Sequence, residues 1–163
     1  MNKKYATLLL ASAVAVASTP ALAATTADLQ ISASVVGACE IEKTADLTFA
    51  NYDALDPQDV DAQGTLRVRC TNGVTGTITL DEGAHADGAA RRMAHATDTN
   101  SFLTYELYSD AAGGTVWNDV DGVTHAGTGA WAPLTVYGRI PSAQPASPAA
   151  GAYADTVVAT VSF

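Results

Sequence analysis

The sequence predicts an all-β protein, a sandwich of short strands, and two patterns support this fold class. Apolar and polar residues alternate with a period of two along most of the chain beyond residue 27, which is the period of a strand with one buried face. Glycine, asparagine and aspartate interrupt these runs at short intervals, as turns between strands require. A chain of 163 residues has the length of one such domain.

The first 23 residues have the composition of a secretory signal peptide. Lys3 and Lys4 give a positively charged start, residues 8–17 are apolar, and residues 21–23 (Ala-Leu-Ala) form a small-residue cleavage site. A membrane anchor is the alternative, but the apolar run is shorter than the roughly 20 residues that span a bilayer. We therefore expect an exported mature chain of 140 residues, without direct membrane insertion.

The charged residues exclude two classes of partner. The chain has 8 Lys and Arg against 17 Asp and Glu, a formal net charge of −9. Nucleic acids and anionic membranes attract clusters of basic residues, and the longest cluster here is the pair Arg91 and Arg92. We expect no nucleic-acid partner, and we expect both arginines to face solvent or to pair with a carboxylate.

Four internal runs show the strand alternation most clearly: residues 64–70, 76–80, 103–107 and 134–140. Every second side chain in these runs is apolar, Cys or Gly, so each predicted strand buries one face. Residues 84–96 tolerate a helix, but Gly88 weakens it, and we expect a loop or a single turn there. Residues 142–151 contain two prolines and predict an exposed connection.

Aromatic residues on these strands allow two interpretations. An exposed row of them would suit a carbohydrate-binding platform, whereas aromatic residues in strands more often fill the core or pair across strands. The four residues concerned are Tyr105, Tyr108, Trp117 and Tyr137. We favour the core interpretation.

Two more alternating segments lie at the ends of the mature chain. Residues 28–36 carry on one face Leu29, Ile31, Ala33 and Val35. Residues 155–163 carry on one face Val157, Ala159, Val161 and Phe163. Exposed strand edges usually carry charge or proline, and the last segment has no charge after Asp155. This favours pairing with a further strand; the alternatives are that residues 28–36 form the first strand of a complete sandwich and that Phe163 is an ordinary core residue.

The residues that could carry chemistry are few. Cys39 and Cys70 are an even pair in an exported protein, and we expect a disulfide between them. The three histidines have no zinc-ligand spacing, and residues 119–122 lack the later ligands of a calcium loop and predict a turn. No hydrolase, metalloprotease or phosphate-loop motif is present. We expect no metal, no cofactor and no enzymatic activity.

A set of motifs in fixed order resembles a known family. The set is Leu-Thr-Phe at 47–49 with Tyr52, Gly-Thr-Leu-Arg-Val-Arg-Cys at 64–70, Arg-Arg-Met at 91–93, Leu-Thr-Tyr-Glu-Leu-Tyr at 103–108 with Asp110, Trp117, Gly-Thr-Gly at 127–129, Leu-Thr-Val-Tyr-Gly-Arg-Ile-Pro at 134–141, and residues 151–163. It is similar to the spore coat protein U domain, the Csu-type subunits of archaic chaperone-usher pili. The chain departs from the family at Ala50, where a glycine is usual.

The resemblance implies an incomplete immunoglobulin-like β-sandwich that lacks its last strand and is completed by donor-strand exchange. Residues 24–36 would be the donor-strand extension, with Leu29, Ile31, Ala33 and Val35 as the inserting side chains, and residues 37–163 would be the sandwich. A periplasmic chaperone would hold the C-terminal strand and the groove edge through Gly151, Val157, Ala159, Val161 and Phe163. These are β-strand-addition contacts.

The resulting functional expectation is a structural subunit of a secreted chaperone-usher pilus, or fimbria, which supports surface adhesion and biofilm formation. Its partners would be other pilin subunits, the periplasmic chaperone and the outer-membrane usher, and its location the cell surface. Two alternatives stay open at this stage. One is a spore or cell-coat protein that forms no pilus, and the other is a monomeric carbohydrate-binding module.

Overall fold

A computed structural model describes residues 23–163, and the chain divides into one unit up to Ser34 and a second from Val35 to Phe163. Residues 1–22, which hold most of the expected signal peptide, lie outside the described residues. In the first unit, residues 23–34 form no strand or helix and their side chains are exposed. The alternative that residues 28–36 are the first strand of the sandwich is not what the structure has, because the first strand begins at Cys39.

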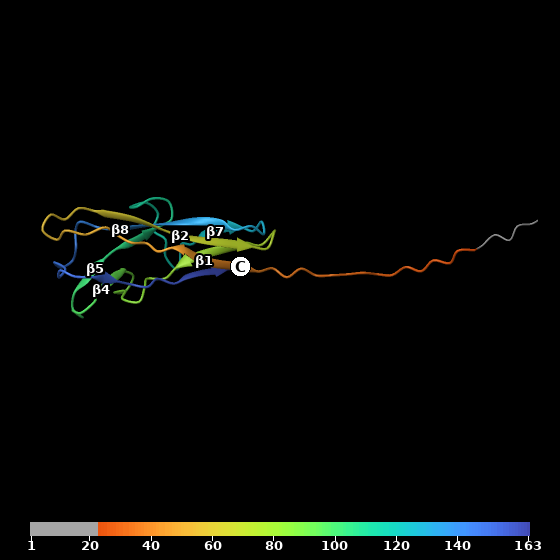
Figure 1. The fold of residues 1–163 in the computed structure, drawn as a ribbon, viewed down its shortest axis with the longest axis horizontal. Helices are drawn as coiled ribbons and strands as arrows, with labels where there is room; N and C mark the ends of the chain where they lie inside the picture. Colours follow the sequence, from red (N-terminus) through yellow and green to blue (C-terminus); the bar gives the residue numbers. More distant parts are fainter. Residues whose placement is uncertain (1–22) are drawn as a thin grey trace, which may run out of the picture. The chain divides into compact units, whose positions relative to one another are not determined.

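The second unit is built from antiparallel strands, and all regular structure in residues 23–163 is β (Figure 1). In chain order the strands are β1 (Cys39–Ala45), β2 (Val60–Cys70), β3 (Thr75–Leu80), β4 (Arg92–His95), β5 (Phe102–Thr104), β6 (Glu106–Tyr108), β7 (Val123–Ala126), β8 (Ala132–Ile140), β9 (Tyr153–Ala154) and β10 (Ala159–Ser162).

These strands form three sheets. One has the order β1-β2-β8-β6, another β10-β3-β7, and the third β5-β4-β9. The longest ladder joins β2 to β8, from Val60 opposite Ile140 to Val68 opposite Ala132. Because side chains alternate across a strand, this register points Val68, Val136 and Ile140 to the same buried face.

The core confirms the alternation that the sequence shows in its four internal runs. It consists of Val68, Cys70, Ile78, Leu80, Leu103, Tyr105, Leu107, Trp117, Val136 and Ile140. Trp117 and Tyr105 are therefore core residues, and Tyr108 and Tyr137 lie opposite each other on β6 and β8. The interpretation of these aromatic residues as core and cross-strand residues is confirmed.

The run 103–107 buries the expected residues, but it is not one strand. β5 belongs to the three-stranded sheet with β4, whereas β6 pairs with β8 in the four-stranded sheet. Between them the N–H of Tyr105 donates to the carbonyl of Arg91 instead of to a partner in either ladder. The chain changes sheets at Tyr105, and the alternation continues across the change because Leu103, Tyr105 and Leu107 all face the same core.

One expectation for residues 84–96 was wrong, and for Arg91 the structure has the second of the two expected arrangements, a carboxylate partner. The segment is not only a loop, because Arg92–His95 forms β4, which pairs with β5 on one side and β9 on the other. Arg91 does not face solvent: only 2% of it is exposed. Its guanidinium pairs with Glu106 and donates to the carbonyls of Leu80, Asp81 and Trp117, so every donor group finds a partner inside the protein.

Candidate functional site

Two strand edges of the sandwich lie next to each other without being paired. β1 is the outer strand of the four-stranded sheet, and β10 is the outer strand of the sheet that contains β3. Figure 1 shows β1, in orange, beside the dark blue C-terminal strand, and the two strands are in contact. Within residues 35–163, no hydrogen-bond ladder joins them. Each strand therefore presents free backbone donors and acceptors along one side.

A groove of about 1170 Å³ opens between these edges. One wall runs from Lys43 at the end of β1 to Leu55, and the other from Pro148 to Ala159. The floor is the sandwich core, and it includes Leu66, Leu80, Met93, Leu103, Tyr105, Leu107, Val136 and Ile140. An apolar floor between two unpaired strand edges has the features that bind an added strand: apolar pockets below and backbone partners on both sides.

The disulfide lies outside the groove, at a place where β1 and β10 come close together. A Cβ atom built on Gly76 would lie 3.0 Å from Val161 Cγ2 and 3.2 Å from Cys39 Sγ, so β1 and β10 converge over this glycine. Neither Cys39 nor Val161 lines the groove. The two strands are antiparallel to their neighbours β2 and β3, and they contribute Lys43, Ala45 and Ala159 to the lining of the groove.

One wall of the groove begins where β1 leaves the sheet. The register between β1 and β2 shifts between Lys43 and Ala45, and the chain then turns inward. Leu47 lies against Gly64 and Gly138, where added Cβ atoms would meet its side chain at 3.0 Å and 2.8 Å. The two glycines thus make room for Leu47 on the inner face of the sheet, and the segment that follows becomes a wall of the groove.

A polar network lies under the wall formed by residues 148–159. The hydroxyl of Tyr105 donates to Asp155 Oδ2 at 2.7 Å, and His85 Nδ1 lies 2.8 Å from Asp155 Oδ1. Burial raises the pKa of Tyr105, and the hydrogen bond to Asp155 raises this pKa further, so the phenol stays protonated and donates. The Asp155 side chain is 3% exposed, and its bonds hold this part of the groove edge in place.

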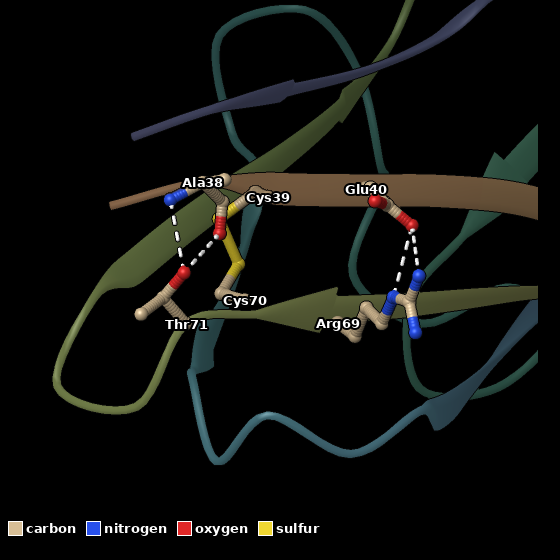
Figure 2. Close-up of a disulfide and its surroundings, with 6 residues drawn as sticks. All are labelled: Ala38, Cys39, Glu40, Arg69, Cys70 and Thr71. Atoms are coloured by element: carbon tan, nitrogen blue, oxygen red, sulfur yellow. Dashed lines mark hydrogen bonds and ion pairs between the residues drawn. A yellow bond between two sulfur atoms is a disulfide. The ribbon is translucent and has the colours of Figure 1, made fainter. Parts of the chain in front are cut away.

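The base of the N-terminal extension is fixed by the disulfide between Cys39 and Cys70, which confirms the predicted pairing (Figure 2). Beside it, the N–H of Thr71 donates to the carbonyl of Ala38 at 2.8 Å, and the N–H of Ala38 donates to Thr71 Oγ1 at 3.1 Å. The ladder between β1 and β2 thus continues one residue beyond the disulfide. The chain is held from Ala38 onward.

The structure brings together some of the predicted site residues and separates others. Gly151, Val157 and Ala159 line the groove, Val161 lies outside its lining beside the disulfide, and Phe163 lies outside it and is 65% exposed. The predicted donor residues lie outside the core: Leu29 is 83% exposed, Ile31 87% and Val35 87%, and Ala33 is also exposed. The roles of all these residues in binding stay predictions.

Sequence reasoning assigned no site role to the segment from Leu47 to Leu55, although it forms one wall of the groove. Leu47, Phe49 and Tyr52 are partly buried against the core, and Tyr52 donates its hydroxyl to the carbonyl of Ser142. The Leu-Thr-Phe alternation at 47–49 was an available signal of one buried face, but it is too short to indicate which face or which partner.

Replacing Gly151 by alanine is expected to destabilise the groove wall by about 1–3 kcal/mol, because overpacking forces side chains and backbone apart. A Cβ on this residue would lie 2.0 Å from His95 Nε2, and His95 is fixed by bonds from the backbone N–H groups of Thr97 and Asp98 to its Nδ1. Urea unfolding measures the effect. In a His95→Ala background the same Gly151→Ala change should cost less; an equal or greater cost in that background would contradict the steric explanation.

Two other features bear on function: groups of metal ligands and membrane-spanning helices. In the part of the chain that the structure describes, no three His, Cys, Asp or Glu side chains are gathered closely enough to hold a metal ion. A search of residues 23–163 finds no helix with the length and apolar character needed to cross a membrane.

Comparisons with known proteins agree with this geometry. A search of solved structures matches the chain to the CsuC–CsuE chaperone–tip adhesion subunit pre-assembly complex from archaic chaperone-usher Csu pili of Acinetobacter baumannii, with a TM-score of 0.56 and 20% sequence identity. The match covers 79% of this chain and 40% of that one, and it supports an immunoglobulin-like all-β fold for this chain.

A comparison of sequences identifies the family directly. The chain is 38% identical to Protein U of Myxococcus xanthus, over 94% of this chain and 93% of that protein. Residues 25–160 match the model of the Spore Coat Protein U domain, a range that includes nearly all of the extension, both walls of the groove and the first half of β10. The chain belongs to the Spore Coat Protein U domain family.

Proposed function

We propose that this chain is an exported structural subunit of a chaperone-usher pilus, polymerised by donor-strand complementation. The observation that carries the proposal is the apolar groove between the unpaired edges β1 and β10, present in a chain whose own extension exposes alternating apolar residues. An extension from another subunit would fill this groove as an added strand. The proposal is of a structural protein without catalytic activity.

The energetics of such a joint favour a durable fibre. Burying each of Leu29, Ile31 and Val35, which are all more than four-fifths exposed in the free extension, contributes about 1.5–3 kcal/mol. Each backbone hydrogen bond to β1 or β10 adds about 0.5–1.5 kcal/mol, before the cost of association. The acidic balance of the chain would repeat along the fibre and keep fibres apart in solution.

The proposal includes the route to the surface and its partners. Residues 1–23 are proposed as a cleaved signal peptide and residues 24–36 as the donor extension. A periplasmic chaperone would occupy the groove first and hold Gly151, Val157, Ala159, Val161 and Phe163, and an outer-membrane usher would then exchange it for the extension of another pilin. Surface adhesion and biofilm formation are the proposed roles of the fibre. The matched CsuC–CsuE complex, which contains a chaperone, supports this order of events for a protein of similar fold.

The first test replaces Ile31 by aspartate. A carboxylate that must enter an apolar groove loses its hydration without gaining a partner, so heat-resistant multimers are expected to disappear. Ile31 is 87% exposed in the free chain, so the folding of the domain should not change. Multimers are measured by gel electrophoresis of unheated and heated samples.

Ser32→Asp is the matched control, because residue 32 lies on the opposite face of the extension and is also exposed. It introduces the same charge one position away, and its multimers should persist. Multimers that survive Ile31→Asp unchanged would mean that residues 24–36 are not the donor strand. Loss of multimers in both variants would show a general effect of charge.

A second candidate function is a structural role in a spore or cell coat without a pilus. The similarity to Protein U over nearly the whole length of both chains favours it, together with the family to which both belong. Electron microscopy of the assembled protein separates the two, since only the pilus proposal requires long filaments. A monomeric carbohydrate-binding module is disfavoured, because Tyr105 and Trp117 are buried and offer no platform.

A further inference from the structure

The turn between β2 and β3, residues 71–74, contains a pair of residues that can react with each other. The N–H of Val74 donates to the carbonyl of Thr71 at 2.9 Å and closes the turn. Gly73 occupies its third position with a φ of 85°, a conformation that side chains rarely adopt. Asn72 precedes it, and both residues are exposed. An asparagine followed directly by glycine in an exposed turn is a candidate for modification of its side chain.

The reaction needs no group from outside the turn except water. The backbone nitrogen of Gly73 forms a bond to Cγ of Asn72 and gives its proton to solvent, and the side-chain nitrogen leaves Cγ as ammonia after taking a proton from solvent. Water then opens the resulting succinimide ring. Opening at Cγ gives aspartate, and opening at the backbone carbonyl gives isoaspartate, in which the main chain runs through the former side chain. Because nucleophile and amide belong to one chain, the reaction is intramolecular.

The surroundings of Gly73 leave room for this ring. A Cβ atom built on Gly73 would meet no atom within 4 Å, so no neighbouring segment crowds the residue. Its N–H donates to the carbonyl of Gly127 at 3.2 Å, a longer bond than the 2.9 Å bond that closes the turn. The nitrogen that must lose its proton is therefore held less closely than the N–H of Val74.

The other asparagines of residues 23–163 lack this combination. Asn51, Asn100 and Asn118 precede tyrosine, serine and aspartate, whose side chains hinder the approach of the backbone nitrogen to Cγ. In addition, Asn118 Oδ1 accepts hydrogen bonds from two backbone N–H groups, at 2.9 Å and 2.6 Å, which hold its amide in place. Asn72 is thus the asparagine of the described chain that both sequence and surroundings favour for the reaction.

From these observations we infer that Asn72 is a site of spontaneous modification, which converts to aspartate and isoaspartate as the protein ages. Isoaspartate adds one atom to the main chain of a turn that supports the base of the extension. The N–H of Thr71 donates to the carbonyl of Ala38, and a Cβ on Gly37 would lie 3.0 Å from Val74 Cγ2. The modification therefore adds a negative charge and loosens the turn beside these residues. The inference does not depend on the proposed function.

The experiment stores the folded mature chain, with its disulfide intact, at mildly alkaline pH and follows each asparagine by mass spectrometry. After reduction, alkylation and digestion with trypsin, residues 70–91 contain Asn72 as their single asparagine, and residues 44–67 contain Asn51. Isoaspartate is measured by methyl transfer with an isoaspartyl methyltransferase. We expect Asn72 to convert at least about tenfold faster than Asn51 or Asn100, which corresponds to a barrier lower by about 1.4 kcal/mol.

Asn72→Gln is the matched control. Glutamine must form a larger ring, so residues 70–91 of this variant should show no conversion and no methyl labelling over the same period. Conversion of Asn72 no faster than that of Asn51 and Asn100 would overturn the inference. So would fast conversion that appears only after the chain is unfolded in urea, because the folded turn would then protect the residue.

Hydrogen exchange tests the effect on the turn. In an aged sample rich in isoaspartate, the amide of Val74 should exchange at least about tenfold faster than in the fresh protein, because the bond to Thr71 no longer fits the longer main chain. Asn72→Asp adds the charge without the extra atom and should exchange like the fresh protein. Unchanged exchange in the aged sample would show that the turn is not loosened and would contradict that part of the inference.

Discussion

Replacing Arg91 by methionine is expected to lower the free energy of unfolding by about 3–5 kcal/mol, the typical cost of removing one partner from a buried ion pair. Arg91 is 2% exposed and Glu106, its ion-pair partner, is 29% exposed, so the remaining carboxylate is only partly compensated by water. Methionine has a similar length but no donors, and the packing of the side chain is largely kept.

The expected loss is large because Arg91 connects segments that no ladder joins. Its Nη2 donates to the carbonyl of Trp117 at 2.9 Å and to that of Asp81 at 2.8 Å, and its own carbonyl accepts from Tyr105 at the point where the chain changes sheets. Removing the guanidinium takes a donor from the buried carbonyl of Trp117 and the part-buried carbonyl of Asp81, and each buried group left unsatisfied costs about 1–3 kcal/mol.

Urea unfolding, monitored by the fluorescence of the buried Trp117, measures this effect. Arg92→Met is the matched control, because Arg92 pairs with Asp87, whose side chain is 74% exposed. That pair is open to solvent, and its loss should cost no more than about 1 kcal/mol. Equal destabilisation by the two substitutions would contradict the role assigned to Arg91.

Removing the disulfide with Cys39→Ser and Cys70→Ser is expected to cost about 3–4 kcal/mol, from the loop entropy of a 31-residue separation. The effect should reach the groove as well, because the sulfur atoms and Val161 pack together over Gly76. Without the covalent bond, β1 is held by its ladder to β2 and by the exposed ion pairs of Glu40 with Arg69 and Glu42 with Arg67, and its first residues loosen beside Val161.

The measurement compares unfolding with and without a reducing agent. Reductant should lower the stability of the wild type to that of the double serine variant and leave the variant itself unchanged. Thr71→Val removes the hydroxyl that accepts from Ala38 but keeps the disulfide, and it should cost only about 1 kcal/mol. A reductant effect on the serine variant, or none on the wild type, would disprove the assignment.

Local patterns in the sequence were enough to predict β2, β3 and β8. In each, alternate residues are buried over at least five positions, and a period of two is a property of the strand itself. The disulfide was also predictable, because two cysteines in an exported chain allow one intramolecular pairing. The order of the motifs also resembles one family, and the comparisons show that the chain belongs to it.

Other features were not predictable from local patterns. β1 was not predicted, because Cys39 and Ile41 are its only half-buried residues and the rest of the strand is exposed, as an edge strand tolerates. The run 103–107 gave no sign of a change of sheet, since its inward-facing residues continue to face one core. Nothing adjacent to Arg91 in the sequence indicates burial, because its partners come from residues 80, 81, 106 and 117.

The sequence alone therefore determined that the chain forms strands, which faces of them are buried, and that an exposed alternating segment precedes the domain. Only the tertiary structure decided which edges stay unpaired, which segments line the groove, and how Ala38 is held at the start of β1. The physical reason is that the alternation of apolar and polar residues depends only on which side of its own strand each residue occupies. Which strand lies at the edge of a sheet depends on pairing between segments far apart in the chain.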